Sequence, residues 1–318
     1  MVKFGIIGAG GISAAFAKAA AVTEGVQIAA VAAQDMKRAQ RFAAEHRIPH
    51  AFGNYAQILS DRSVDAVYIG NTTNFHYNCI KMCLAAGKHV LCEKAMVETE
   101  AKAQECFDMA RGQGLFLMEA MWSRFLPKTQ KVRDWVLGGR IGNVTGVQAT
   151  IGGCFDKDPG NRFYSPALGG GAMYDLGVYP IELIPYFTGL DINAYSAKVI
   201  LAATGVDESI SLTLDLEGTP AHAMISFNAA LPGDCWIYGE NGCIKIPHFH
   251  WGSEAVLYGP DMKETEHFSQ PEENGMRFEI AEAVHCITEQ YSTSDIATPE
   301  MTITACRIYD SVLGKKKD

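Results

Sequence analysis

Short apolar runs alternate with longer helix-forming segments from residue 3 to about residue 120, and this alternation restricts the fold more than any other feature of the sequence. The runs include KFGII, VQIAAVAA, AVYIG, HVLCE and LFLMEA. A strand that is apolar along its whole length offers no face to water, so it belongs in a parallel sheet covered on both sides. The pattern therefore predicts a doubly wound α/β domain.

The second half of the chain has a different hydrophobic pattern. Strand-like segments follow one another there, and in the stretch SISLTLDLEG the apolar residues from Ile210 to Leu216 alternate with Ser211, Thr213 and Asp215. A period of two is typical of an antiparallel strand with one face covered. We therefore predict an α+β domain with a predominantly antiparallel open sheet.

The boundary between the domains is predicted in the stretch MEAMWSRFLPK, where the last parallel strand ends and Pro127 interrupts regular structure. We assign residues 1–122 to the first domain and residues 123–318 to the second. The chain has 318 residues, which is long enough for each domain to bury its own core. Near the end, Thr298 and Pro299 have the residue types expected at the cap and first turn of a final helix.

The composition argues against nucleic-acid and membrane partners. Lys and Arg number 27 against 36 Asp and Glu, so the net charge of −9 would repel a phosphate backbone. No apolar run reaches the roughly 18 residues that a membrane-spanning helix needs. The start, MVKFGIIGAGG, has the pattern of a first strand and not of a signal peptide. The final KKKD is expected to be a solvated tail.

The cysteines and histidines do not form a metal-binding pattern. Nine cysteines are scattered without a CxxC pair, mostly inside apolar stretches, which is typical of reduced core residues in a cytoplasmic protein. His248 and His250, in PHFHWG, form a His-x-His pattern without a carboxylate partner. We interpret this segment as an aromatic wall of a pocket or a dimer contact, and predict no metal site.

A glycine-rich loop follows the first predicted strand at once. Gly8, Gly10, Gly11, Ile12 and Ser13 follow the G-x-G-x-x-G pattern, with serine in the third glycine position. The first glycine allows a tight turn, and the second lets a pyrophosphate approach the backbone N–H groups at the start of the next helix. Because the loop lies between a strand and a helix, it predicts a Rossmann dinucleotide-binding site, to which the serine hydroxyl can add a donor.

The end of the second strand bears on the choice between NAD and NADP. An NAD-binding unit has an acidic residue there, whereas this chain has Ala33 and Gln34, and Asp35 lies further on, where it can cap the next helix. Ala33 leaves room for a 2′-phosphate, and Lys37 or Arg38 can supply its countercharge, although both also suit a helix surface. The pattern favours NADP, with NAD as the alternative.

Three further segments carry a resemblance to a known family. They are VYIGNTTNFHYNCIKMCLAAGKHVLCEK at residues 67–94, LMEAMWSRFLP at 117–127 and GGGAMYDLGVYPIEL at 169–183. With the glycine loop, they make nearly the whole chain similar to the glucose-fructose oxidoreductase and inositol dehydrogenase family, often called Gfo/Idh/MocA. Within it the chain resembles the branch of the dimeric dihydrodiol dehydrogenases and NADP-dependent D-xylose dehydrogenases.

The resemblance implies a role for the end of the strand HVLCE. Glu93 and Lys94 correspond to the family's Glu-Lys-Pro motif, whose lysine lies beside the nicotinamide and the substrate. The fold favours the same place, because open α/β sheets bind ligands outside the carboxyl ends of their strands. Ala95 stands where the family has proline, and we expect this to loosen the backbone that orients Lys94.

The resemblance also implies a catalytic role for Asp175 and Tyr179. Many family members have an aspartate followed four residues later by histidine, whereas this chain and the dihydrodiol dehydrogenase branch have tyrosine there. Tyr179 is the candidate for proton transfer. A lysine ammonium about 4 Å away is worth roughly 4 kcal/mol at an effective dielectric near 20, which would bring the pKa of tyrosine toward neutrality. We expect Asp175 to orient Lys94 or a substrate hydroxyl.

Residues next to other strand ends complete the predicted site. Asn71, Thr72 and His76 follow a parallel strand, and we assign them to the cofactor, although His76 also suits packing at the start of a helix. Trp122 and Arg124 follow the last parallel strand and are expected to hold a sugar or diol. A structural role for Trp122 is an equal alternative.

These features predict an NAD(P)-dependent dehydrogenase or reductase that transfers hydride between the nicotinamide and a sugar, polyol or trans-dihydrodiol. The alternative is a catalytically weak or inactive NAD(P)-binding regulatory protein, for which Ala95 is the main support. Reduction of a larger substrate such as a tetrapyrrole is a third possibility. The family resemblance implies a homodimer or homotetramer in carbohydrate metabolism.

Overall fold

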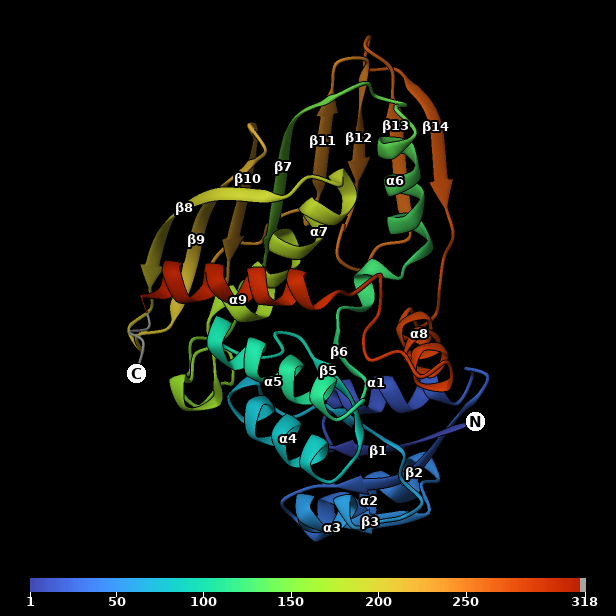
Figure 1. Ribbon diagram of the computed structural model, residues 1–318. Coiled ribbons are helices and arrows are strands. Elements are labelled where there is room, and N and C mark those ends of the chain that lie inside the picture. The colour runs from blue at the N-terminus through green and yellow to red at the C-terminus, as the bar shows by residue number, and fades with distance from the viewer. Residues whose placement is uncertain (315–318) are drawn as a thin grey trace. The chain divides into compact units, whose positions relative to one another are not determined.

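A computed structural model describes residues 1–314, and the KKKD tail lies outside the described residues. The chain divides into two compact units, whose elements are labelled in Figure 1. The first comprises Met1–Trp122 and Asn274–Cys306, and the second comprises Ser123–Glu273 and, within the described residues, 307–314. Residues 274–306 thus return to the first unit, whereas the predicted division gave every residue after 122 to the second domain.

The first unit is built on a six-stranded parallel sheet. Its strand order is β3-β2-β1-β4-β5-β6, and every neighbouring pair is parallel. The strands are β1 (Val2–Ile7), β2 (Val26–Ala32), β3 (His50–Phe52), β4 (Ala66–Ile69), β5 (His89–Glu93) and β6 (Leu117–Ala120). Strands β4 and β6 are buried along their whole length, and the order reverses at β1, which confirms the predicted doubly wound sheet.

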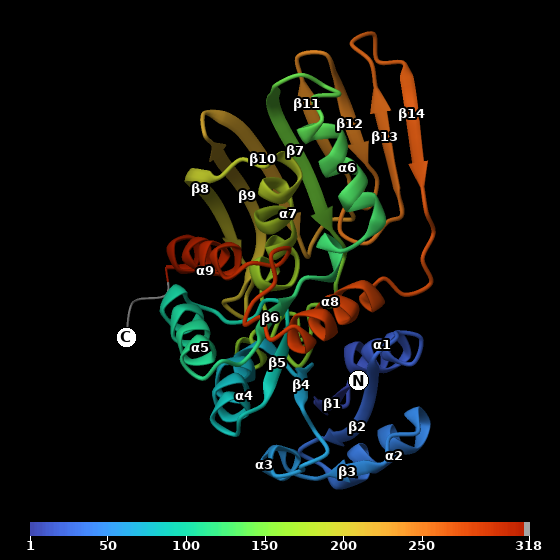
Figure 2. The ribbon, with the colours of Figure 1, turned by 45° about the vertical axis from the view of Figure 1, so that its right-hand side comes forward.

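Among the described residues the first unit has seven helices, of which the first five connect strands of the sheet. They are α1 (Gly11–Ala20), α2 (Met36–His46), α3 (Tyr55–Leu59), α4 (Thr73–Ala85), α5 (Glu100–Gly112), α8 (Met276–Thr288) and α9 (Pro299–Leu313), the last being assigned to this unit up to Cys306. Helix α1 contacts α2 and α8, while α4 contacts α3 and α5, and Figure 2 shows α4 beside α5. Right-handed crossovers that run in opposite directions from β1 place the two groups on opposite faces of the sheet. Because α8 also contacts β1, its segment joins the first unit.

The second unit is built on an eight-stranded mixed sheet. Its order is β14-β13-β12-β11-β7-β10-β9-β8, in which β7 and β10 pair parallel and the other pairs are antiparallel. The strands are β7 (Val144–Gly152), β8 (Ile192–Leu201), β9 (Asp207–Leu216), β10 (Thr219–Ser226), β11 (Cys235–Gly239), β12 (Gly242–Ile246), β13 (Glu254–Tyr258) and β14 (Glu264–Ser269). The predominantly antiparallel sheet is the one that the sequence predicts.

Helices cover one face of this sheet. They are α6 (Pro127–Leu137) and α7 (Val178–Thr188), with the π-helical turn η3 (Met173–Gly177). The short elements η1 (Trp122–Arg124) and η2 (Pro166–Leu168) lie in the connecting segments. Helix α6 contacts β13 and β14, α7 contacts β7, and Figure 2 shows both helices against the strands. In β9 the side chains of Ile210 and Leu212 are buried and those of Ser211 and Thr213 are exposed, as the period of two requires.

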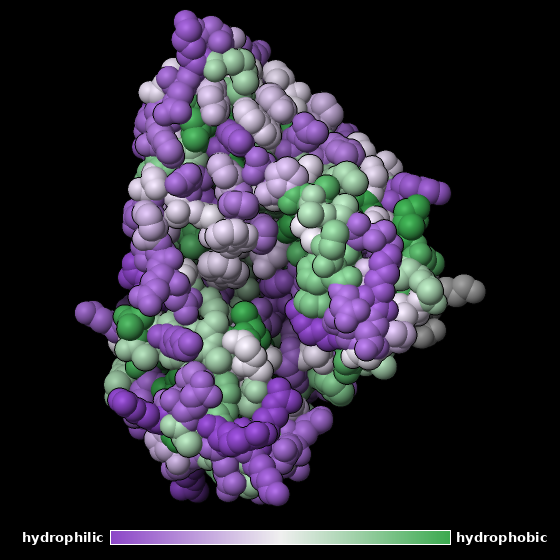
Figure 3. All heavy atoms as spheres, turned by 180° about the vertical axis from the view of Figure 1, so that it is seen from behind, coloured by the Kyte–Doolittle hydropathy of each residue, from purple (hydrophilic) through white to green (hydrophobic). Residues whose placement is uncertain are grey.

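The helix α6 corrects one detail of the boundary. Pro127 does not interrupt regular structure but is the first residue of α6. A proline suits this position because the N–H that it lacks would have no partner within the helix. Among the described helices, none has the length and apolar character required to span a bilayer. Hydrophilic and hydrophobic residues are mixed over the face of the surface drawn in Figure 3.

Candidate functional site

The glycine-rich loop has the backbone geometry that a dinucleotide requires. Gly8 has a φ of +100°, and a Cβ there would lie 2.9 Å from backbone atoms of Gly70 and Asn71. Helix α1 begins at Gly11 with Gly10 as its cap, and no side chain within residues 1–314 caps it. The backbone N–H groups of its first turn are therefore available to an anion, which the helix dipole also favours. The loop fits a bound pyrophosphate.

The two residues after the glycines have different surroundings. Ile12 is 42% exposed, whereas Ser13 has no exposed surface, and its hydroxyl has no hydrogen-bond partner among the described residues. A Cβ at Gly70 would lie only 2.5 Å from Ser13 Oγ, so the serine fills a tightly packed position. Ser13 therefore replaces the glycine that lets helix and strand pack closely, and its hydroxyl is not exposed at the anion site.

Arg38 reaches the glycine loop from α2. Its Nε donates to the backbone O of Ala9 at 3.0 Å, although the residue is otherwise exposed. Asp35 caps α2 by accepting from the Lys37 N–H at 2.9 Å, as its position beyond the strand suggested. Ala33 is buried at the end of β2, and next to it Gln34 is exposed. Arg38 is therefore the basic side chain that the structure places at the loop.

Asn71 and Thr72 follow β4 at the same edge of the sheet. Both are half-buried. Thr72 precedes α4 and its Oγ1 donates to Asn74 Oδ1 at 2.8 Å, while Asn71 Nδ2 donates to Cys79 Sγ at 3.3 Å. Both residues thus lie where a cofactor bound at the glycine loop would extend, and their contact with it stays a prediction.

Lys94 follows the last residue of β5 and is half-buried. The peptide bond between Lys94 and Ala95 is cis. The side chains of Ala95, Met96 and Val97 have no exposed surface. The Met96 N–H donates to Glu119 Oε1 at 2.8 Å, and the Val97 O accepts from the Cys306 Sγ at 3.3 Å. The segment after Lys94 is therefore fixed on several sides.

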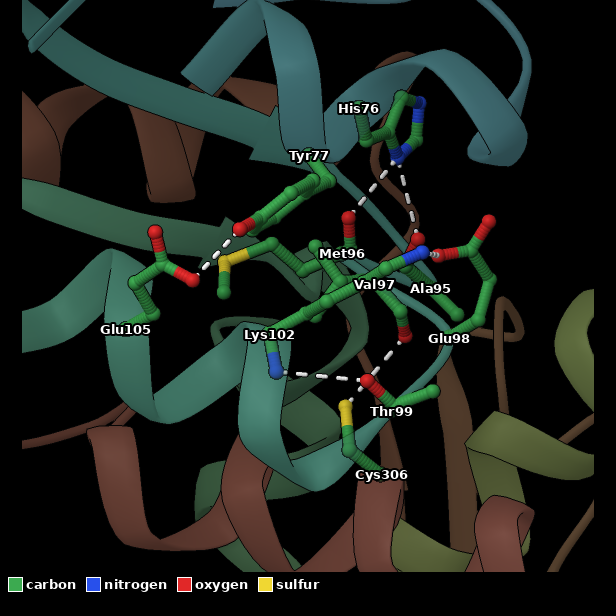
Figure 4. A network of polar contacts seen from close by, with 10 residues as sticks. All are labelled: His76, Tyr77, Ala95, Met96, Val97, Glu98, Thr99, Lys102, Glu105 and Cys306. Atoms are coloured by element: carbon green, nitrogen blue, oxygen red, sulfur yellow. Dashed lines mark hydrogen bonds and ion pairs between the residues drawn. The ribbon is translucent and has the colours of Figure 1, made fainter. Parts of the chain in front are cut away.

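His76 holds the same segment from α4. Its Nδ1 lies 3.1 Å from the Ala95 O and 3.2 Å from the Met96 O, as Figure 4 shows. Its Nε2 lies 3.1 Å from the Asn71 O. Burial lowers the pKa of His76, and the three carbonyls oppose this change. His76 therefore links two strand ends, and this anchoring offsets the looser backbone expected from Ala95. Its predicted contact with the cofactor remains a prediction.

Glu93 is the buried acid next to Lys94. Its Oε1 accepts from the Tyr68 OH at 2.6 Å, and its Oε2 accepts from the Lys94 N–H at 3.3 Å. Burial raises the pKa of Glu93 to about 7, although the hydrogen bond from Tyr68 and the Lys94 ammonium oppose it. A carboxyl group with this pKa changes its charge near neutral pH.

Glu279, in α8, is a second buried acid that the sequence did not single out. Its side chain has no exposed surface, and neither carboxyl oxygen has a hydrogen-bond partner within residues 1–314. Burial, and then the negative charge of Glu93, raise the pKa of Glu279 well above its ordinary value. Two buried carboxyl groups that repel each other do not both ionise at neutral pH. We therefore expect Glu279 to keep its proton.

In the second unit, Asp175 and Tyr179 lie on adjoining turns. Asp175 belongs to the π-helical turn η3 and forms an ion pair with Arg162 at 3.4 Å. Tyr179 is in the first turn of α7 with 7% of its surface exposed, and its ring centroid lies 4.9 Å from that of His250. The structure thus gives Asp175 a cationic neighbour and Tyr179 an aromatic one within their own unit.

The two predicted substrate residues differ in exposure. Trp122 is half-buried at the start of η1. Arg124 is 1% exposed, its Nη2 pairs with Glu182 Oε2 at 2.9 Å, and its guanidinium lies over the Tyr186 ring. This geometry gives Arg124 a structural role, and its burial weighs against the predicted contact with substrate.

His248 and His250 do not assemble a metal centre in the part of the chain that the structure describes. His248 stacks on Trp251 at 4.6 Å, and His250 contacts Tyr179. Lys128, which the sequence does not single out, is fully buried, and its Nζ donates to the backbone O of His248. A lysine next to proline at a helix start gives no sequence signal of burial.

Comparison with family models gives matches along most of the chain. A model described as "Oxidoreductase family, NAD-binding Rossmann fold" matches residues 2–121, and one described as "GFO/IDH/MocA C-terminal domain" matches residues 129–245. Trans-1,2-dihydrobenzene-1,2-diol dehydrogenase of Xenopus tropicalis is 34% identical over 321 residues, covering 98% of this chain and 97% of the relative. The protein of the same name from Sus scrofa is 32% identical, with 93% and 91% covered.

Solved structures share the fold at lower identity. KijD10, a 3-ketoreductase from Actinomadura kijaniata in complex with NADP and TDP-benzene, superposes with a TM-score of 0.88 at 24% identity, covering 98% of this chain and 96% of that one. Aldose-aldose oxidoreductase from Caulobacter crescentus, complexed with glycerol, gives a TM-score of 0.88 at 22% identity, with the same coverage.

Replacing Glu279 with glutamine should change how stability depends on pH. A buried acid whose pKa is raised makes the folded state hold a proton that the unfolded state releases above its ordinary pKa of 4.5. The free energy of unfolding of the wild type should therefore fall as pH rises above that value. Glu279→Gln should remove the contribution of one titrating group to this slope, which is about 1.4 kcal/mol per pH unit. Urea unfolding from pH 5 to pH 8 measures the slope. Exposed Glu289→Gln, at the end of the same helix, is the control, and equal slopes in all three proteins would contradict the assignment.

Proposed function

Because the chain belongs to the Gfo/Idh/MocA family of NAD(P)-dependent oxidoreductases, we propose that it acts with NADP on the hydroxyl-bearing carbon of a trans-dihydrodiol, sugar or polyol, or on the corresponding carbonyl. The observation that carries the proposal is the fixed position of Lys94 after β5, in the same unit as the glycine loop. That edge of a doubly wound sheet is where a dinucleotide and its substrate lie. The bound nicotinamide supplies or accepts the hydride.

Lys94 and Tyr179 share the proton transfer in this proposal. A tyrosine with an ordinary pKa of about 10 is a poor base at neutral pH, so a neighbouring positive charge must favour its phenolate. Lys94 is half-buried, where its charge acts more strongly than in water. Tyr179 takes the proton of the substrate hydroxyl in the oxidative direction and returns it in the reductive one. Asp175, which pairs with Arg162, is assigned to orienting a substrate hydroxyl.

The preference for NADP rests on Arg38. Its guanidinium contacts the glycine loop through Ala9, and the small Ala33 stands at the end of β2, where an NAD-binding unit has an acid. A planar guanidinium is suited to binding a phosphate through two hydrogen bonds. Arg38 would therefore hold the 2′-phosphate, with Gln34 beside it, while Gly8, Gly10, Gly11 and Ile12 approach the pyrophosphate.

Trans-dihydrodiols are the first substrate class to test, because the curated relatives that match nearly the whole chain are named for that activity. Sugars and polyols follow from the wider family, and the half-buried Trp122 is assigned to their binding.

Cytoplasmic location is proposed from the nine cysteines, which are all free and, except for Cys154, buried. Assembly as a homodimer or homotetramer, and a place in carbohydrate metabolism, are proposed from the family alone.

An inactive regulatory protein is the weaker alternative. It rested on Ala95, but the Ala95 and Met96 carbonyls are bound by His76, and the Met96 N–H by Glu119. The backbone after Lys94 therefore has its own supports without a proline ring. No observation specifically favours loss of activity.

Lys94→Met and Tyr179→Phe should each lower kcat strongly, to a small residual rate, while NADPH still binds. Removing a positioned acid–base group costs about 100-fold or more in kcat, whereas the glycine loop and Arg38 are untouched. Absorbance at 340 nm (a standard assay wavelength) with a panel of diols, sugars and their carbonyl forms measures turnover, and NADPH fluorescence measures binding. Lys81→Met and Tyr195→Phe, both at half-buried positions, are matched controls that should retain activity. Wild-type turnover in either site variant would refute that residue's role.

Arg38→Ala should weaken NADP binding more than NAD binding. Loss of a guanidinium–phosphate contact is expected to raise the Kd for NADPH about 10- to 100-fold, and the Kd for NADH by less than about threefold. Lys37→Ala, at the neighbouring exposed position, should leave both dissociation constants nearly unchanged. Equal losses for the two cofactors would show that Arg38 supports the loop without recognising the 2′-phosphate.

A further inference from the structure

A buried lysine holds the segment PHFHWG, residues 247–252, which we name the 247–252 turn. Lys128, in the first turn of α6, is 1% exposed, and its Nζ donates to the backbone O of His248 at 3.2 Å and to that of Phe249. Burial lowers the pKa of Lys128 to about 7. Because a buried ammonium group is costly unless hydrogen bonds compensate it, these carbonyls and the lysine fix each other.

A second buried side chain holds the next carbonyl of the turn. Ser123 Oγ donates to the backbone O of His250, and Thr129 Oγ1 donates to the backbone O of Ser123 at 2.7 Å. Neither Ser123 nor Thr129 has exposed surface. Three successive carbonyls, those of residues 248–250, are therefore bonded to buried side chains next to the start of α6.

The turn is also braced from within. The Phe249 side chain is fully buried, and its N–H donates to the Gly233 O at 2.9 Å. The Trp251 N–H donates to the His248 O at 2.9 Å, and the rings of these two residues stack at 4.6 Å. Since the residues on both sides of His250 are held in this way, its backbone has a defined position.

From that position His250 reaches the proposed base. Its ring and that of Tyr179 are 4.9 Å apart between centroids, with their planes tilted by 47°. A tilted aromatic pair at this distance is a favourable contact. Tyr179 is otherwise nearly buried in α7, with 7% of its surface exposed. The imidazole therefore restricts the orientations that the phenol ring can take.

We propose that His250 is a positioning residue for Tyr179, and that Lys128 acts through it by anchoring the 247–252 turn. The inference rests on the proposed function, in which Tyr179 moves the proton. A displacement of about 1 Å at a reacting group can cost roughly 100-fold in rate. Loss of this support should therefore lower kcat, and it should leave NADPH binding, which depends on the first unit, nearly unchanged.

The first experiment compares His250→Ala with His250→Phe, and Lys128→Met with Lys131→Met. We expect His250→Ala and Lys128→Met to lower kcat about 10- to 100-fold, with the Kd for NADPH within about twofold of wild type. His250→Phe keeps a ring against Tyr179 and should recover most of kcat. Lys131, also in α6, forms its ion pair with Glu266 in β14 at 3.0 Å, so Lys131→Met should match wild type.

A double-mutant cycle then separates this inference from the proposed function. If His250 acts through Tyr179, His250→Ala should cost little more in the Tyr179→Phe background, because the residue that it positions is already lost. Full additivity of the two losses would overturn the positioning role. An active Tyr179→Phe would overturn the proposed base and this inference with it. An inactive Tyr179→Phe beside a fully active His250→Ala would overturn the inference alone.

Folding of each variant is checked by circular dichroism. If Lys128→Met does not fold, the comparison of His250→Ala with His250→Phe tests the proposal by itself. An equal loss of kcat in His250→Ala and His250→Phe would show that a ring at this position does not orient Tyr179, and a loss restricted to His250→Ala would support the role.

Discussion

Parallel pairing of β1, β4, β5 and β6 is the constraint from which the first unit's candidate site follows. The register sets Ile7 opposite Ile69 and Ile69 opposite Cys92, so these strands end at one edge. Gly8, Asn71 and Lys94 come directly or almost directly after those ends. Where the ladder stops, backbone groups need new partners, and His76 supplies them between two strand ends. The same hydrogen bonds that complete the fold therefore also fix the lysine that the proposed chemistry uses.

Both units bury ionisable groups beside their candidate catalytic residues. Glu93 is next to Lys94, and Glu279 interacts with Glu93. Lys128 donates to the turn whose His250 ring packs against Tyr179. Each burial costs stability and shifts a pKa, and such shifts gather at functional sites more often than elsewhere. In the first unit the result is an acid that changes charge near neutral pH. In the second it is a lysine that holds a backbone turn in place.

The sequence predicts the parts of the fold that depend on local pattern. Fully apolar runs predicted the parallel strands, a period of two predicted β9, and the position of the glycines between a strand and a helix predicted the loop at Gly8. Residues whose importance comes from distant packing gave no such signal. Glu279 follows β14 in a segment that returns to the first unit, and its acid type is ordinary on a helix. Lys128 has the sequence of a surface residue at a helix start, and only the tertiary structure buries it.

The most direct test of the account is the transfer of deuterium from NADPH labelled at the nicotinamide C4 position to a carbonyl substrate, followed by mass spectrometry. The account predicts that the wild-type enzyme places one deuterium on the carbon that bears the new hydroxyl, and that Tyr179→Phe binds the labelled cofactor but transfers the deuterium about 100-fold more slowly or worse. Tight binding of NADPH with no transfer to any diol-derived or sugar-derived carbonyl, or transfer at the wild-type rate in Tyr179→Phe, would contradict it.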